Sequence, residues 1–432
     1  MTVASDIAVN TVNFLALPAT FFIEYNRECC DRKWCMSPIQ KILFGSPGTG
    51  KSYKVLEIAE DELGISGDKQ HSNIVKTVFH PEYKYSDFIG KLLPFSSGNS
   101  ITYKYYAGHF FKALGKAYRC IIDGTWQQYL LVIDEFNRGN AAAIFGNIFQ
   151  LLDRDENGWS SYSIDISEME MVGLLSAIGY KVKVYDEGIQ VNNSAFETFI
   201  DKLKGDIKHF SGELNKDEKF QKAAKLIENI EKFKVIIPPE LSIIATINTS
   251  DESIYYLDTA FKRRWDWEYV EAPSIDTIIN QQVPEEIKII ELSMPEDKII
   301  RWCLVIIGVN EFIKSCHHSI RKIEDKQIGW WFIIPKKIYD NNPEKFAYRY
   351  VISFQQVRDK LMFYLWDSVF GRDKKPLIKL IRDKLNKSNV ELITYADFLK
   401  YTQELLKYWH DSVPEIKNTE ETTRKARIQR TF

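Results

Sequence analysis

The octapeptide GSPGTGKS at residues 45–52 has the composition of a loop that binds phosphate groups. Glycines at this spacing let the backbone curl so that its amide groups face an anion, and the positive end of a following helix adds to the attraction. In such a loop the lysine reaches the β- and γ-phosphates of a nucleotide, and the next hydroxyl binds Mg²⁺. The residues predicted to bind nucleotide are Gly45, Pro47, Gly48, Thr49, Gly50, Lys51, Ser52 and Tyr53. Ser52 is also a predicted metal ligand.

Two acidic residues end an apolar run, LVIDE, that finishes at residue 135. An apolar strand places Asp134 at its tip, where a carboxylate can join the Mg²⁺ shell, usually through water. Glu135 follows directly and can orient or deprotonate the attacking water. The pair therefore predicts metal-assisted hydrolysis of a nucleoside triphosphate.

A third block, IIATINTSD, spans residues 243–251 and places Asn248 at the end of another apolar run. An amide at a strand tip can hydrogen-bond the γ-phosphate or the attacking water. The alternative is an asparagine that only forms a turn.

Two consecutive arginines, Arg263 and Arg264, end the sequence AFKRR a few residues later. Arginines in this place reach the γ-phosphate bound by a neighbouring subunit, which predicts an oligomer with its sites between subunits. The alternative is a basic helix end favoured by the helix dipole.

Apolar strands alternate with helices around these motifs. Continuous apolar strands separated by helices predict a parallel sheet that is covered on both faces, hence an α/β fold. The predicted strands are at 41–45, 73–80, 129–137 and 241–249, with a last strand ending near 270. The predicted helices are at 52–63, after Gly108, and at 141–155, and an aromatic-rich loop is predicted at 80–90.

An extra segment at about 160–235 separates the acidic strand from the asparagine strand. It contains a predicted hairpin at 180–191 and two amphipathic helices near 195–210 and 212–233. The chain becomes mostly helical from about residue 273. The predicted division is an N-terminal segment (1–40), an α/β nucleotide-binding domain (41–272) with the insertion, a helical lid domain (273–415) and a polar, basic tail (416–432).

Composition limits the function classes. The 432 residues carry a net charge of −2, so no overall basic signature of a nucleic-acid binder is present. Six cysteines form no Cys-x-x-Cys pair, which argues against zinc and for reduced thiols in a cytoplasmic protein. The apolar stretch at 12–25 is broken by Asn13 and Pro18 and is too short to span a membrane, so a packing or docking role is expected.

The blocks resemble those of AAA+ ATPases and, within them, the McrB family, the GTP-driven motors of modified-cytosine restriction that pair with an McrC-type nuclease. Similarity extends over roughly residues 40–375, with a gap at the insertion. The stretches that carry it are VFHPEYKYSDFIG (78–90), LVIDEFNRGNAAAIFGNIFQLLD (131–153), INTSDESIYYLDTAFKRRW (247–265), QIGWWF (327–332) and KLMFYLWDSVF (360–370).

The resemblance implies an AAA+ P-loop NTPase that uses Mg²⁺ and hydrolyses ATP or GTP in a hexamer-type ring. It implies the motor subunit of an McrBC-like anti-phage restriction system, with DNA contacted through the ring or a partner. DNA cleavage would fall to an McrC-like nuclease subunit of the PD-(D/E)xK type. Asn137 and Arg138 match the positions where the family couples hydrolysis to that nuclease.

The sequence also departs from the family pattern. Glu252 replaces an arginine of the family, and Trp330 and Trp331 replace His-Ser. About 40 residues precede the glycine-rich loop, so no separate reader of modified DNA is expected there. Whether the substrate is ATP or GTP stays open.

Two other classes share some of these features. A protein-remodelling ATPase of the MoxR or dynein-related kind has the same blocks, but the Phe-His-Pro and Asn-Arg-Gly-Asn sequences argue against it. A nucleotide-gated scaffold would oligomerise with little nucleotide turnover. The presence of Glu135 and of the paired arginines argues against this hypothesis.

Overall fold

The computed structural model describes residues 37–66, 72–97, 100–125, 127–186, 188–210, 216–249, 255, 257–339 and 348–414. Expectations for the apolar stretch 12–25, for Glu252 and for the tail at 416–432 lie outside these residues. None of the described helices is long and apolar enough to cross a membrane.

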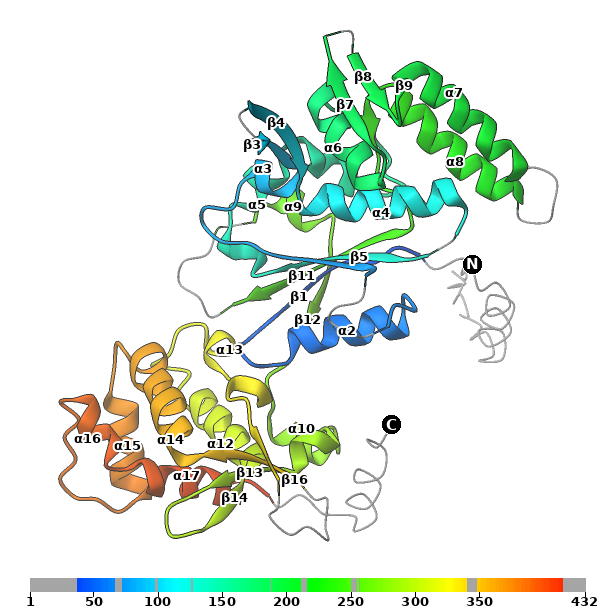
Figure 1. Ribbon diagram of the computed structural model, residues 1–432. Helices are drawn as coiled ribbons and strands as arrows, with labels where there is room; N and C mark the ends of the chain where they lie inside the picture. The colour runs from blue at the N-terminus through cyan, green and yellow to red at the C-terminus, as the bar shows by residue number, and fades with distance from the viewer. Residues whose placement is uncertain are drawn as a thin grey trace, which may run out of the picture. The chain divides into compact units, whose positions relative to one another are not determined.

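A five-stranded parallel sheet organises the part of the chain before residue 273 (Figure 1). Its spatial order is β12-β1-β11-β5-β2. The strands are β1 (Gln40–Gly45), β2 (Ile74–Val78), β5 (Tyr129–Asp134), β11 (Leu241–Asn248) and β12 (Asp266–Tyr269). All neighbouring pairs run parallel, so the predicted α/β fold with a central parallel sheet is confirmed.

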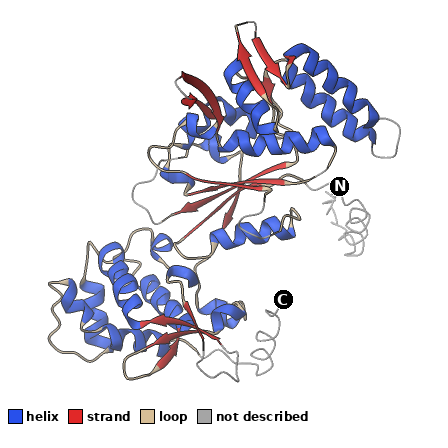
Figure 2. Cartoon of the chain, in the orientation of Figure 1, coloured by secondary structure: helices blue, strands red, loops and turns tan. Residues whose placement is uncertain are grey.

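Helices cover both faces of this sheet, which explains its uninterrupted apolar strands (Figure 2). On one face α2 (Lys51–Asp61) packs Val55 and Ile58 against side chains such as Ile244. On the other face lies α4 (His109–Asp123), which buries ten of its residues. β11 shows the consequence, because seven consecutive residues of its sequence are buried.

A hairpin stands between α3 (Tyr85–Phe88) and α4, where only a loop and a helix start were predicted. It consists of β3 (Gly90–Ser97) and β4 (Ser100–Ala107) in antiparallel register. Tyr105 of β4 is buried against Gly173, where a β-carbon would lie 2.2 Å from the tyrosine ring. Glycine at that position therefore lets the hairpin dock.

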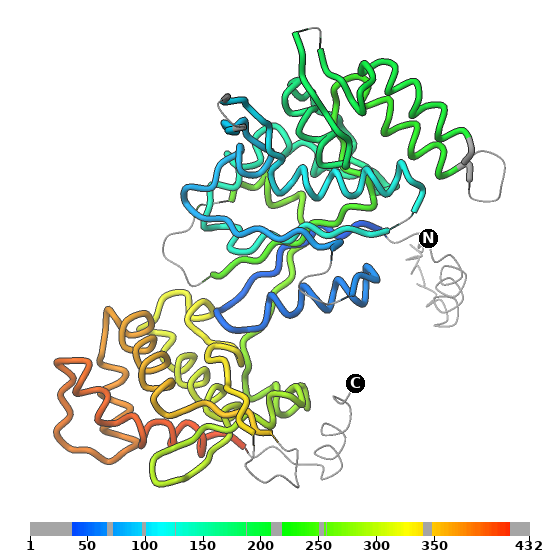
Figure 3. The backbone as a smooth tube through the Cα atoms, viewed as in Figure 1, coloured from blue at the N-terminus to red at the C-terminus, as the bar shows by residue number. Residues whose placement is uncertain are grey.

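The two ends of the insertion lie together, because β6 (Ile164–Asp165) pairs antiparallel with β10 (Lys234–Val235) in a small sheet of their own. The insertion, coloured green in the tube, lies on the side of the central sheet that α4 covers (Figure 3). The predicted hairpin and both predicted helices are present. A further helix, α6, and the short strand β9 were not predicted. The elements between β6 and β10 are α6 (Glu168–Ile178), β7 (Val182–Tyr185), β8 (Gly188–Val191), β9 (Ser194–Ala195), α7 (Phe196–Asp206), the 3₁₀ turn Ile207–Phe210 and α8 (Lys216–Glu231).

The helix predicted at 141–155 is shorter than expected. The α-helical part, α5, covers Ala141–Phe145 and is followed by 3₁₀ turns over Gly146–Leu152. Gly146 has a φ of 52°, which an α-helix does not accommodate. A short 3₁₀ turn (Phe136–Arg138) precedes α5, and α9 (Thr259–Lys262) precedes β12.

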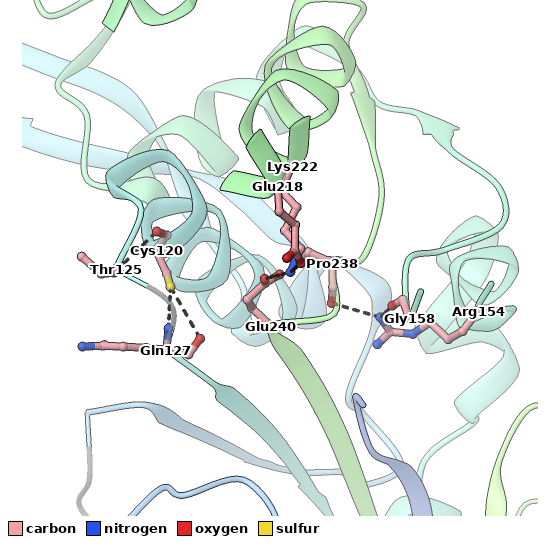
Figure 4. Close-up of polar contacts among 9 residues, drawn as sticks. All are labelled: Cys120, Thr125, Gln127, Arg154, Gly158, Glu218, Lys222, Pro238 and Glu240. Carbon is pink, nitrogen blue, oxygen red and sulfur yellow. Dashed lines mark hydrogen bonds and ion pairs between the residues drawn. The ribbon is translucent and has the colours of Figure 1, made fainter. Parts of the chain in front are cut away.

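A buried polar cluster surrounds the start of β11 (Figure 4). Glu240 accepts a hydrogen bond from Lys222 Nζ of α8 at 2.9 Å. Arg154 donates to the carbonyl oxygens of Gly158 (2.8 Å) and Pro238 (3.1 Å), and burial lowers its pKa to about 9. The insertion is thus tied to the strand that carries Asn248.

Beyond residue 273 the chain builds a separate apolar core around the buried helix α12 (Trp302–Ser315). The prediction of a mostly helical segment missed a four-stranded sheet of order β14-β13-β16-β15. These strands are β13 (Ile290–Ser293), β14 (Ile299–Arg301), β15 (Lys336–Tyr339) and β16 (Tyr348–Ser353). The other elements are α10 (Ile275–Ile279), α11 (Glu285–Lys288), α13 (Ile323–Lys326), a 3₁₀ turn (Trp330–Phe332), α14 (Phe354–Gln356), two π-helical segments (Val357–Met362 and Leu365–Val369), α15 (Lys375–Lys384), α16 (Tyr395–Leu399) and α17 (Thr402–Asp411). The predicted boundary near residue 272 stays a prediction.

Candidate nucleotide-binding site

The glycine-rich loop connects the end of β1 to the start of α2 at Lys51. Gly48 (φ 75°) and Gly50 (φ 91°) adopt the left-handed conformation that glycine allows at low cost. A β-carbon on Gly48 would also lie 2.5 Å from the backbone nitrogen of Phe332. The curl of the loop therefore depends on these two residues having no side chain.

Lys51 lies inside this curl. Its side chain is buried, and Nζ donates hydrogen bonds to the carbonyl oxygens of Gly45 (3.0 Å) and Ser46 (2.8 Å). Thr49 Oγ1 also donates to the Ser46 carbonyl at 3.0 Å. The ammonium group is thus held where the loop would surround a phosphate.

The QIGWWF stretch holds the outer side of the loop. The backbone N–H of Gly329 donates to the Pro47 carbonyl and that of Trp331 to the Gly48 carbonyl, both at 2.9 Å. In a trans peptide the N–H points opposite to the carbonyl of the same unit. The amides of Gly48 and Thr49 therefore point away from this stretch and stay available for an anion.

Asp134 ends β5 with both carboxylate oxygens engaged. Oδ1 accepts a hydrogen bond from Thr246 Oγ1 at 3.0 Å, and Oδ2 lies 2.7 Å from Lys76 Nζ. Thr246 belongs to β11 and Lys76 to the edge strand β2. Neither Thr246 nor Lys76 was predicted from the sequence as a site residue.

Glu135 follows the strand in a left-handed backbone conformation (φ 54°). Such a conformation costs a non-glycine residue about 1–3 kcal/mol and is concentrated at functional sites. Its Oε1 accepts a hydrogen bond from Asn248 Nδ2 at 2.5 Å. The structure thus brings together two residues that are 113 positions apart.

Asn137 and Arg138 differ in accessibility. Asn137 is buried, and its Nδ2 donates to the Asn248 carbonyl at 3.2 Å while its own carbonyl accepts from the Tyr255 N–H at 2.9 Å. Arg138 is about half exposed, with Nε 3.7 Å from Glu135 Oε2. Asn137 therefore holds the backbone of Asn248 from the protein interior, whereas the Arg138 side chain is accessible to another molecule.

The Phe-His-Pro block supports the same residues. The Phe79 N–H donates to the Asp134 carbonyl at 2.9 Å, and its ring stacks on Phe136 with centroids 5.5 Å apart. Nearby, Tyr83 Oη lies 2.8 Å from His109 Nδ1, and burial raises the pKa of Tyr83 to about 12. The block therefore fixes the turn that carries Glu135.

The two arginines have different environments. The Arg264 side chain is 8% exposed, donates to Asp153 Oδ2 at 2.6 Å and lies over the Phe149 ring at 3.9 Å from its centroid. It also donates to the Ala260 carbonyl at 2.9 Å. Arg263 is exposed. Of the two arginines, Arg263 is therefore the one that another molecule can reach.

The donor set fits a magnesium–nucleotide complex. The loop amides and Lys51 suit phosphates, and the Ser52 hydroxyl with the Asp134 carboxylate supplies the oxygen ligands that Mg²⁺ prefers. Parallel pairing of Gly45 with Asn248 places the loop and the asparagine at one edge of the sheet. A nucleotide would bring a γ-phosphate to this edge, beside Glu135.

Comparison with known proteins agrees with the motifs. No protein-family model matches the sequence. The chain is 27% identical over 356 residues to YdiS of Bacillus subtilis, a component of the type II restriction enzyme BsuMI, covering 77% of this chain and 80% of YdiS. It is 27% identical over 161 residues to the EcoKMcrB subunit of a type IV methyl-directed restriction enzyme of Escherichia coli, covering 34% of this chain and 33% of that protein.

Solved structures show weaker likeness. A proposed ATPase of Cytophaga hutchinsonii (TM-score 0.24, 68% of this chain and 63% of that one) and PCH-2 of C. elegans (TM-score 0.19, 85% and 60%) are each 11% identical. At such scores the fold assignment depends on the sheet order alone. The two sequence relatives confirm the predicted resemblance to McrB and to components of restriction enzymes.

Proposed function

We propose that the protein is a nucleoside-triphosphatase and the motor subunit of an McrBC-like restriction system. The observation that carries this proposal is the hydrogen bond between Asn248 and Glu135 beside the glycine-rich loop. Lys51 and the loop amides bind the phosphates, and Ser52 and Asp134 hold Mg²⁺. Glu135 accepts a proton from the attacking water, while Asn248 fixes the direction of its carboxylate.

The site is completed by a second copy of the chain. An arginine that stabilises charge on the transferred γ-phosphate accelerates hydrolysis by about 10³–10⁵-fold in related chemistry. Arg263 is exposed and can supply this group to a neighbouring site. The protein therefore acts as a ring, and we expect a hexamer.

Other subunits perform the DNA cleavage. Both sequence relatives are described as a component or subunit of a restriction enzyme. By analogy this chain works with an McrC-like nuclease of the PD-(D/E)xK type and contacts DNA through the ring or that partner. Arg138 is the accessible residue through which the nuclease would influence Glu135.

Nucleotide turnover by the purified chain tests the core of the proposal. ATP and GTP are compared in parallel, with Lys51→Ala to remove phosphate binding and Glu135→Gln to remove the base. Turnover that both variants abolish supports the proposal, and a preference for GTP strengthens the McrB-type assignment. A preference for ATP with stimulation by a protein client favours a remodelling ATPase. Absence of turnover and of binding with both nucleotides overturns the proposal.

A further inference from the structure

Lys76 is a charged residue at the site that none of the motifs includes. It lies on β2 and pairs in register with Val132 of β5, two residues before Asp134. Paired residues of parallel strands share a face of the sheet. Val132 belongs to the core on the α2 side, so Lys76 and Asp134 both project toward the side on which the glycine-rich loop leads into α2.

The ammonium group of Lys76 lies 2.7 Å from Oδ2 of Asp134, and Thr246 occupies Oδ1. A carboxylate that binds a magnesium ion or its water must offer at least one oxygen to it. Both oxygens of Asp134 already have partners, and only one of these partners is a cation. Lys76 reaches Asp134 from the β2 side, whereas the glycine-rich loop lies beyond β11 on the other side, so the ammonium group engages one oxygen of the carboxylate and offsets its charge.

Exposure makes this contact reversible. The Lys76 side chain is 51% exposed, whereas that of Asp134 is 15% exposed. A long, solvated side chain can swing away at little cost, because exposed ion pairs contribute only about 0–1 kcal/mol. The carboxylate itself stays fixed by Thr246.

From this arrangement we infer that Lys76 is a positioning residue that competes with Mg²⁺ for Asp134. The ammonium group offsets the negative charge of Asp134 and engages one of its oxygens. A magnesium ion that uses this carboxylate must compete with the ion pair, so Lys76 raises the Mg²⁺ concentration needed for tight nucleotide binding. This inference rests on the proposed function, because it presupposes a magnesium–nucleotide site.

The test measures nucleotide binding rather than turnover. A ribose-labelled fluorescent nucleotide is titrated with Mg²⁺ in the Glu135→Gln background, with and without Lys76→Met. We expect Lys76→Met to lower the Mg²⁺ midpoint roughly two- to fivefold, as expected for loss of an exposed ion pair. Affinity for the nucleotide in EDTA should not change, since no metal then competes for Asp134.

Two control variants separate this effect from a general loss of charge. Lys76→Arg keeps the ion pair and should keep the original midpoint. Lys91→Met removes a comparable exposed lysine of β3, which pairs with Asp87 of α3 at 2.8 Å. This variant should also keep the original Mg²⁺ midpoint. Thermal unfolding of each variant shows that the fold is retained.

The outcomes are distinct. An unchanged or higher Mg²⁺ midpoint for Lys76→Met overturns the inference. Weaker nucleotide binding in EDTA also overturns it, because Lys76 would then contact the phosphates. If the Glu135→Gln chain with Lys76 intact shows no Mg²⁺-dependent nucleotide binding at all, the proposed function itself fails.

Discussion

The side-chain amide of Asn248 donates a 2.5 Å hydrogen bond to Oε1 of Glu135. Asn248 ends β11 and Glu135 follows the adjacent strand β5, and the carboxyl ends of these strands meet at one edge of the sheet. A donor aimed at one oxygen stabilises the anionic carboxylate and fixes its orientation. Since Asn248 also pairs in register with Gly45, any movement of the loop on binding phosphate can reach Glu135 through a single residue.

Replacing the proposed base should separate binding from hydrolysis. Glu135→Gln keeps an oxygen that can accept the Asn248 hydrogen bond but cannot take a proton. We expect turnover to fall by about 10²–10⁴-fold, the contribution of a general base, with nucleotide affinity within a few-fold of the original. Phosphate release and equilibrium binding measure the two quantities. Turnover reduced less than fivefold would instead favour a nucleotide-gated scaffold.

The two neighbouring arginines should give opposite phenotypes. Arg264→Ala breaks the buried contact with Asp153 and should lower the free energy of unfolding by roughly 2–3 kcal/mol, as for hydrogen bonds to charged groups. Arg263→Ala removes an exposed side chain and should leave stability within about 0.5 kcal/mol, while turnover collapses. Chemical denaturation and turnover of both variants provide the comparison. Equal stability of the two variants would contradict the assignment.

Mixing of subunits tests whether Arg263 acts in trans. An Arg263→Ala subunit has an intact nucleotide loop, whereas a Lys51→Ala subunit has an intact arginine. Each is expected to be inactive alone, and mixed rings should regain part of the turnover because one copy completes the site of the other. If the mixed oligomers form, as judged by light scattering, but stay inactive, Arg263 is not the residue supplied across the interface.

The order of the motifs was enough to predict the sheet and the meeting of Glu135 and Asn248 near the loop, because Gly45 and Asn248 end apolar strands and Glu135 follows one. Lys76 could not be found this way, since a single lysine on an edge strand looks solvent-exposed and its partner is far along the chain. The separate environments of Arg263 and Arg264 also depend on a distant residue, Asp153. The β3 hairpin was missed because Pro94 interrupts its first strand pattern.

Tyr118 should be important for stability and not for chemistry. Its hydroxyl donates to the Ile236 carbonyl at 2.7 Å and accepts from the Ile236 N–H at 3.0 Å, fully buried between α4 and the end of the insertion. Tyr118→Phe leaves both backbone groups without that partner, which costs about 1–3 kcal/mol. Urea denaturation should show this loss, with nucleotide affinity unchanged. A neutral effect would mean that water replaces the hydroxyl.

Glu268 of β12 should make the nucleotide-binding half sensitive to acid. Its carboxylate contacts Lys41 Nζ of β1 at 2.8 Å and Lys54 Nζ of α2. Burial alone would raise the pKa of Glu268, but the hydrogen bonds from the two lysines outweigh it and hold the pKa below its ordinary value of 4.5. The folded state therefore binds this proton less readily than the unfolded chain does.

It follows that the contribution of Glu268 is fully present above about pH 4.5, the unfolded value, and is lost as the pH falls through the lower folded value. Glu268→Gln should cost about 0.5–1 kcal/mol at pH 7, because the pair is partly exposed. That difference should shrink as the pH falls below about 4.5 and through the lower folded value, and high salt should also reduce it. Unfolding free energies measured across this range, with Glu404→Gln as a control for a surface pair with Lys387, give the comparison. A destabilisation that stays constant with pH would mean that Glu268 acts through packing and not through its charge.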